Sequence, residues 1–192
     1  AIAHWLVMVG FLLGSMVWFE AYIQIFDPEG GWPIIGSWGV YHFIDELLGL
    51  GTVIGIIALI IVRQNIGDKD KKARFYGSNS GAAYFVEAVV LIEGLGMIFV
   101  KASKIATFAS YEGGHAATDF FTMQLAKILP ESPLLVSIFA LIKLLSGMIW
   151  LFIVGQNIKW GVAWHRFMAF FNIFLKRNSD GRNALGLSLI HI

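Results

Sequence analysis

The stretch that decides the fold is residues 134–177, which read LLVSIFALIKLLSGMIWLFIVGQ and then NIKWGVAWHRFMAFFNIFLKR. Its few basic side chains are Lys143, Lys159, Arg166, Lys176 and Arg177. An apolar run of this length predicts one membrane helix over residues 134–175 that continues into the interface. His165 lies in the interfacial part of that helix, where a polar group next to hydrocarbon needs a partner.

Three earlier segments are also long enough to cross about 30 Å of hydrocarbon at about 1.5 Å per residue. They cover residues 2–26, 43–62 and 82–100. Hydrophobic residues make up 57% of the chain and charged residues 14%, whereas soluble domains carry about 25% charged residues. The sequence therefore predicts an all-α fold, a polytopic transmembrane helix bundle with four spans.

One domain, residues 1–182, holds the predicted spans, and residues 183–192 form a tail. The chain opens AIAHWL without an initiator Met, so we expect a fragment whose natural start lies upstream. The final run LSLIHI, residues 187–192, resembles a translated sequencing adapter, and we expect it to be non-native.

The distribution of basic residues predicts an orientation. The loop between the second and third spans carries a basic run from Arg63 to Arg74, which is most simply a solvated loop near anionic headgroups. The tail is basic too, the loop after the first span has no Lys or Arg, and the third loop has a few: Lys101, Lys104 and Lys127. Because cytoplasmic loops are enriched in Lys and Arg, both ends of the fragment are predicted to be cytoplasmic.

This orientation places His4 and His165 at matching depth, at the cytoplasmic ends of the first and last spans. Neighbouring antiparallel helices can bring two such imidazoles to opposite faces of one porphyrin, so both residues are predicted to bind the iron of a haem b. The alternative is two interfacial histidines that touch only water and headgroups. His165 lies far from the apolar centre near Trp150, so the site would be shallow. His42 and His115 fall on the outer side without an evident helical partner.

Five acidic residues lie in or near the spans: Glu20, Asp45, Glu46, Glu87 and Glu93. Carboxylates at this depth are candidates for function and should face the bundle interior. Glu20 and Glu46 lie in the outer half, where they are candidates for proton uptake or for binding a quinone, with structural pairing as the alternative. Glu87 and Glu93 are six residues apart and do not share a helical face, and Lys143 is a candidate ion-pair partner for one of the acids.

Glycines at four-residue spacing occur in GFLLG, residues 10–14, and in GTVIG, residues 51–55. This spacing favours close helix–helix contact, with clearance for a porphyrin as the alternative. Gly147 and Gly155 fit either role.

Three stretches carry a family resemblance: AHWLVMVGFLLGSMVWFEAYIQIF at 3–26, RFYGSNSGAA at 74–83 and WHRFMAFFNIFLKR at 164–177. With the acidic start of the second helix, they resemble the membrane domain of actinobacterial-type membrane-bound iron–sulfur oxidoreductases, the electron-transfer-flavoprotein:menaquinone oxidoreductases. That domain is similar to the nitrate reductase gamma subunit, a five-helix b-type cytochrome. The resemblance covers residues 1–182 and implies that they are helices two to five of such a domain.

The resemblance implies that His4 and His165 hold the cytoplasmic-side haem. A second haem is not expected, because Gly147 stands where another histidine would be needed. It also implies a direction, from reduced electron-transfer flavoprotein through cytoplasmic iron–sulfur clusters and haem b to menaquinone, in a bacterial cytoplasmic (inner) membrane.

The expected enzyme is therefore a quinone-linked oxidoreductase of which this chain is the membrane domain. The chain has no Cys, so its iron–sulfur clusters are expected only in a part that follows Arg182. The expected partners are membrane lipid, a quinone, the cytoplasmic iron–sulfur domain and the flavoprotein, with no nucleic acid. Two alternatives remain open, an ion or proton transport component in which the carboxylates and Lys143 line a path, and a haem-free anchor for a soluble reductase.

Overall fold

The computed structural model of the chain describes residues 2–66, 79–178 and 180. It contains α1 (Ile2–Phe26), the 3-10 turn η1 (Ile35–Ser37), α2 (Gly39–Ile66), α3 (Ser80–Thr107), α4 (Thr122–Ala126), α5 (Pro133–Gln156) and α6 (Gly161–Phe174). Four of these helices, α1, α2, α3 and α5, are long and apolar enough to cross a membrane. The predicted all-α bundle with four spans is therefore confirmed.

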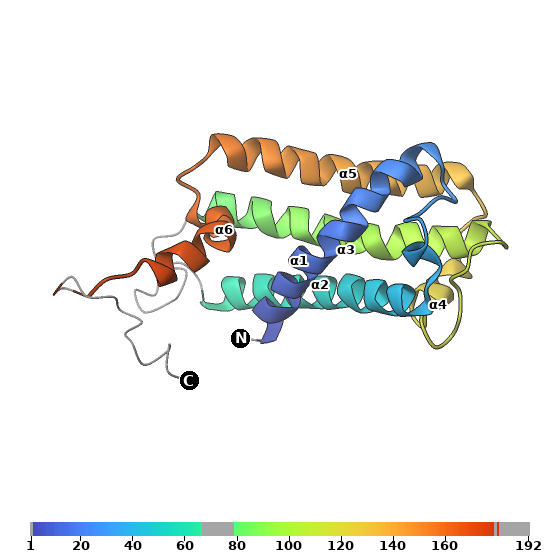
Figure 1. The fold of residues 1–192 in the computed structure, drawn as a ribbon, viewed down its shortest axis with the longest axis horizontal. Coiled ribbons are helices and arrows are strands. Elements are labelled where there is room, and N and C mark those ends of the chain that lie inside the picture. The colour runs from blue at the N-terminus through green and yellow to red at the C-terminus, as the bar shows by residue number, and fades with distance from the viewer. Residues whose placement is uncertain (1, 67–78, 179, 181–192) are drawn as a thin grey trace.

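The helices α2, α3 and α5 run side by side, and α1 crosses them diagonally (Figure 1). We call the end that carries α6 and the start of α1 the α6 end, and the opposite end, with α4 and the long loops, the α4 end. The first predicted span, 2–26, coincides with α1, whereas α2 and α3 extend beyond 43–62 and 82–100 at both ends.

The prediction of one continuous helix over residues 134–175 is wrong. α5 ends at Gln156, and a turn leads into α6, which lies at an angle to α5 (Figure 1). The backbone N–H of Asn157 donates to Val154 O at 3.1 Å, and its side-chain Nδ2 donates to Ile153 O at 2.7 Å. These bonds satisfy carbonyls of the last turn of α5, so the helix ends there without leaving them unpaired.

The contact between α1 and α2 depends on glycine. A Cβ added at Gly10 would lie 2.0 Å from Thr52 Oγ1, and one added at Gly55 would lie 2.8 Å from the carbonyl oxygen of Ala3. Both distances are shorter than any van der Waals contact, so the helices approach this closely because the two positions lack a side chain. The predicted role of these glycines in helix contact is confirmed.

Three basic residues that the sequence placed in loops lie inside helices and are buried: Arg63, Lys101 and Lys104. The Nε atom of Arg63 is 2.7 Å from Glu87 Oε1, so this arginine closes an ion pair between α2 and α3. The assignment of Arg63 to a solvated loop is therefore wrong, and residues 67–74 of that basic run lie outside the described residues. Of the three basic residues counted for the third loop, Lys127 is the one that is exposed in a loop region.

Replacing Gly55 by Val should separate α1 from α2. The new side chain has to displace the backbone at Ala3, and overpacking of this kind costs about 1–3 kcal/mol of folding free energy. The matched control is Gly155→Val, because a Cβ at Gly155 meets nothing within 4 Å. We expect a lower thermal unfolding midpoint in detergent for Gly55→Val alone, and equal midpoints for the two variants would contradict this packing.

Candidate functional site

His4 and His165 meet at the α6 end of the bundle, although they come from opposite ends of the chain. Their ring centroids are 6.1 Å apart, and the ring planes are inclined by 42°. Both side chains are exposed rather than enclosed, which agrees with the shallow position expected from the sequence. The structure therefore brings together the two histidines that were predicted to pair because they lie at matching depth in the membrane.

The break after α5 makes this meeting possible. At about 1.5 Å per residue, a continued helix would carry His165 more than 10 Å beyond the end of α5. Instead α6 folds back, and Phe167 packs against Phe11 of α1 and Trp150 of α5, with ring centroids 6.3 and 6.4 Å apart. This aromatic contact docks α6 on the bundle two residues from His165.

The His165 ring is oriented by its own helix. Its Nδ1 lies 3.2 Å from the carbonyl oxygen of Gly161. Because a carbonyl only accepts, Nδ1 carries the proton in this contact, and the lone pair of a neutral ring is then on Nε2. Metal-binding histidines are commonly held in this way, with one nitrogen donating to a carbonyl and the other free to bind the metal.

The spacing of the two rings fits one metal ion between them. With imidazole–metal bonds of about 2.0–2.1 Å on either side, two ring centroids lie about 6 Å apart. A zinc site would need further protein ligands, and no group of three or more His, Cys, Asp or Glu residues is found in the described part of the chain. A haem needs just two axial ligands from the protein, so the pair fits a haem better than a bare ion.

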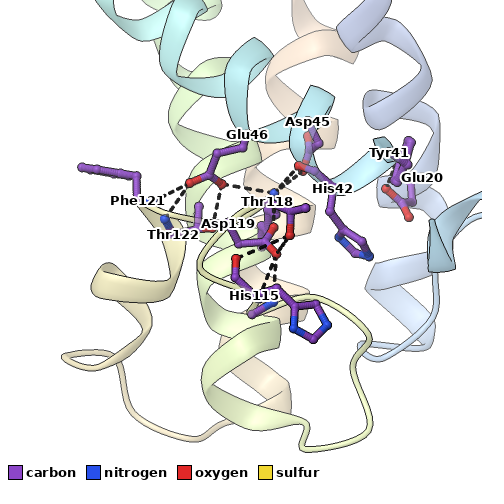
Figure 2. Close-up of polar contacts among 12 residues, drawn as sticks. Glu20, Tyr41, His42, Asp45, Glu46, His115, Thr118, Asp119, Phe121 and Thr122 are labelled. Carbon is purple, nitrogen blue, oxygen red and sulfur yellow. Dashed lines mark hydrogen bonds and ion pairs between the residues drawn. The ribbon is translucent and has the colours of Figure 1, made fainter. Parts of the chain in front are cut away.

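A second polar site lies at the α4 end, where Asp45, Glu46 and Asp119 lie close together (Figure 2). Lys101 of α3 lies among these acids. Its Nζ is 2.6 Å from Asp119 Oδ1, 3.1 Å from Glu46 Oε2 and 3.9 Å from Asp45 Oδ2. It also donates to the carbonyl oxygen of His42 at 2.6 Å. One buried ammonium thus joins α2, α3 and the loop before α4.

Glu46 is held by the start of α4. Its carboxylate accepts from the backbone N–H groups of Phe121 and Thr122 at 2.7 and 2.9 Å, and from Thr122 Oγ1 at 2.7 Å (Figure 2). A carboxylate at a helix start satisfies N–H groups that have no partner within the helix. This geometry favours the structural alternative for Glu46 over a role with quinone.

Asp119 ties the same loop together. Its Oδ2 accepts from Gly114 N–H at 3.0 Å and from Thr118 Oγ1 at 2.7 Å. Burial by itself raises the pKa of this carboxyl, but the hydrogen bonds from Lys101 and Thr118 and the Lys101 charge outweigh it and leave the pKa below its usual value of 3.8. The Asp119 side chain is therefore an anion at neutral pH.

Glu20, in contrast, lines a polar cavity of about 190 Å³ at the α4 end, which we call the polar cavity. Its Oε2 accepts from Tyr41 Oη at 2.7 Å, and its Oε1 accepts from Trp32 N–H at 3.1 Å. Lys104 and Tyr111 share the wall of this cavity. Glu20 thus stays in reach of a small polar ligand or of water, whereas Glu46 does not line the cavity.

His42 and His115 differ from the pair at the α6 end. His42 is buried, and its Nδ1 lies 3.2 Å from Tyr111 Oη, so its partner comes from a loop rather than from a helix. Burial raises the pKa of the Tyr111 hydroxyl well above 10.0, so this hydroxyl keeps its proton. His115 is exposed on the loop before α4.

Lys143, a candidate ion-pair partner of the acids, is fully buried within α5. Its Nζ donates to the carbonyl oxygen of Val17 at 2.7 Å, and among the described residues no salt bridge joins it to an acid. Glu87 is paired with Arg63 instead, and Glu93 accepts from Ser146 Oγ at 2.7 Å. The two glutamates therefore face different helices, as their spacing indicated.

A larger cavity of about 390 Å³ lies in the middle of the bundle, and we call it the central cavity. Its wall is largely apolar, with Gly14 and Trp18 from α1, Glu93 from α3 and Gly147 and Trp150 from α5. From the sequence, Glu20 and Glu46 were the candidates for a role with quinone, and Glu93 was not among them. The sequence held one indication of this cavity. Glycines of α1 and α5 lie at the depth of Glu93, and the absence of side chains at these glycines leaves room in the bundle.

Replacing Lys101 by Met should destabilise the α4 end strongly. The change leaves Glu46 and Asp119 buried without their shared cation, and breaking a buried ion pair on one side costs about 3–5 kcal/mol. We expect a large fall in the thermal unfolding midpoint in detergent, and little change for Lys127→Met, since Lys127 is exposed. Equal behaviour of the two variants would refute the role of Lys101.

Comparisons with protein-family models, with curated proteins and with solved structures find no match for this chain. The function of the two sites is therefore inferred from their own geometry and chemistry.

Proposed function

We propose that this chain is the membrane electron-transfer domain of a quinone-linked oxidoreductase, in which His4 and His165 hold one haem b. The observation that carries the proposal is the approach of these two imidazoles to a centroid distance of 6.1 Å. The alternative of two unrelated interfacial histidines gives no reason for them to face each other across two helices.

When bound between the rings, haem b would supply one-electron transfer at a potential set by its surroundings. The contact with the Gly161 carbonyl orients the His165 ring. Phe11, Trp150 and Phe167 pack on the side of the site that faces the bundle. These ring contacts hold α6 against α1 and α5.

The proposed orientation has the α6 end on the cytoplasmic side of a bacterial inner membrane. Lys176 and Arg177 follow α6 and are exposed there. At the α4 end, Lys101 and Lys104 are buried and no longer count as loop charges, which leaves Lys127 as an exposed base. With fewer basic residues in the loops of the α4 end, the positive-inside rule supports this orientation more strongly.

The proposed electron donor is a cytoplasmic iron–sulfur domain fed by electron-transfer flavoprotein, and the proposed acceptor is menaquinone. Both come from the resemblance of residues 3–26, 74–83 and 164–177 to electron-transfer-flavoprotein:menaquinone oxidoreductases. A histidine site at the surface of the α6 end is accessible to such a donor, because both rings are exposed.

An ion or proton transport component is the second candidate. The fully buried Lys143 favours it, since a charged side chain inside a membrane bundle is costly and commonly marks an ion or proton path. A transport protein of this kind conducts in proteoliposomes without any haem. A haem-free membrane anchor is the least supported of the three candidate functions, because an anchor has no need of buried acids and lysines in its spans.

The proposal predicts that the haem content depends on both histidines. In the full-length protein purified in detergent, a pyridine haemochrome assay should give about one haem b per chain, and His4→Ala, His165→Ala and the double variant should lose it. The matched control is His115→Ala, an exposed histidine at the α4 end, which should retain the haem. A double variant that folds and keeps its haem would refute the ligand assignment.

A further inference from the structure

The central cavity carries polar groups that play no part in the histidine site. Trp18 and Thr52 lie in its wall together with Glu93. The Trp18 Nε1 and Thr52 Oγ1 atoms are buried, and neither has a hydrogen-bond partner within the described residues. Thr52 Oγ1 packs against Gly10, and Trp18 Nε1 packs against Gly147, so of these three residues it is Glu93 that offers its polar group to a ligand in the cavity.

The central cavity opens sideways towards lipid, between α1 and α5. Leu12 and Phe19 of α1 and Leu151 of α5 line it, and their side chains are 61%, 53% and 53% exposed. Exposed side chains of membrane-spanning helices face acyl chains, so a hydrophobic molecule can enter from the bilayer without crossing water. The volume of about 390 Å³ lies within the range of about 300–1,000 Å³ that is usual for small-molecule sites.

Glu93, like Glu20, is joined to no base by a salt bridge among the described residues, but it is Glu93 that lines the central cavity. Its Oε1 accepts a hydrogen bond from Ser146 Oγ, whereas Glu87 is paired with Arg63. An anion in an apolar wall without a cation is costly. A carboxyl group in this position is suited to binding and releasing a proton next to a ligand.

We propose that the central cavity binds the ring of a membrane quinone, with Glu93 exchanging protons with the ring oxygens. The inference rests on the electron-transfer function proposed above and gives that function its acceptor site. A quinone has a planar apolar ring with two oxygen acceptors and an isoprenoid tail, which matches this wall and its lipid opening. A lipid acyl chain offers no acceptor for the proton of Glu93.

The central cavity begins close to the histidine site. Phe11 lines the cavity seven residues after His4, which is about 10 Å along α1. Phe167 lines it two residues after His165. The same two helices therefore carry the histidines and reach the quinone ring, so an electron has a short path between the two sites.

Reduction of one quinone consumes two electrons and two protons and forms two O–H bonds. A haem held by His4 and His165 would supply the electrons one at a time, and each proton passes from the Glu93 carboxyl to a ring oxygen. Glu93 regains each proton from water.

The binding site can be tested without relying on haem. An azido-naphthoquinone is photolysed with the full-length protein in proteoliposomes, and the labelled peptides are identified by mass spectrometry. We expect labelling of residues that line the central cavity, with menadione competing for it. Labelling elsewhere, or labelling that menadione does not displace, would overturn the proposal and leave the cavity to lipid chains.

A cavity-filling variant sharpens this test. A Cβ at Gly14 lies 3.6 Å from Met97 Sδ, an ordinary contact, so Gly14→Leu fills the cavity without a backbone clash. We expect labelling to fall by about 10-fold or more, the scale of small steric changes in an apolar pocket. The control is Gly155→Leu, which adds the same side chain to open space on α5. Equal labelling of the two variants would contradict the site.

The role of Glu93 is tested by the rate at which menadione oxidises the dithionite-reduced haem. Glu93→Gln keeps a side chain that can still bond to Ser146, and we expect the rate to fall by about 100-fold with photolabelling retained. Glu131→Gln, an exposed carboxylate outside the spans, should leave the rate unchanged. An unchanged rate in Glu93→Gln would remove the proton-exchange role.

The two proposals fail in different ways. A protein without haem that is still labelled in the central cavity would refute the histidine site and keep the quinone site. A protein with haem that is labelled elsewhere would keep the histidine site and refute the quinone site.

Discussion

The structure depends on the pairing of polar side chains in a medium without water. A buried lysine or acid in hydrocarbon is stable when the protein itself supplies its partners. Lys101 and the acids around it tie the α4 end into one network, and the Arg63–Glu87 ion pair joins α2 to α3. These ion pairs hold the helices together. The polar side chains that take no part in them are the candidates for function.

The two proposed sites lie at different depths. The imidazoles of His4 and His165 face each other at the α6 end, and the carboxyl group of Glu93 faces the central cavity. Phe11 and Phe167 pack against each other and line that cavity. The arrangement suits a chain that receives electrons at one surface and delivers them to a hydrophobic carrier inside the membrane.

The spans and the pairing of His4 with His165 could be predicted because hydropathy and helix direction determine membrane depth. The break at Asn157 could not, since residues 134–175 are apolar on both sides of it, and one Asn is a weak signal. Lys101 and Lys104 were assigned to a loop because a hydropathy pattern ends where charges begin, although α3 continues to Thr107. The central cavity depends on glycines from separate helices, whose alignment is a property of the packed bundle.

The most direct test of the histidine site is low-temperature electron paramagnetic resonance of the oxidised full-length protein in detergent. Two imidazole ligands make ferric haem low-spin, so we expect a low-spin signal in the wild type. Any haem that His4→Ala or His165→Ala retains should become high-spin, because one axial ligand is missing. A high-spin wild-type signal, or a low-spin signal unchanged in both variants, would contradict the account.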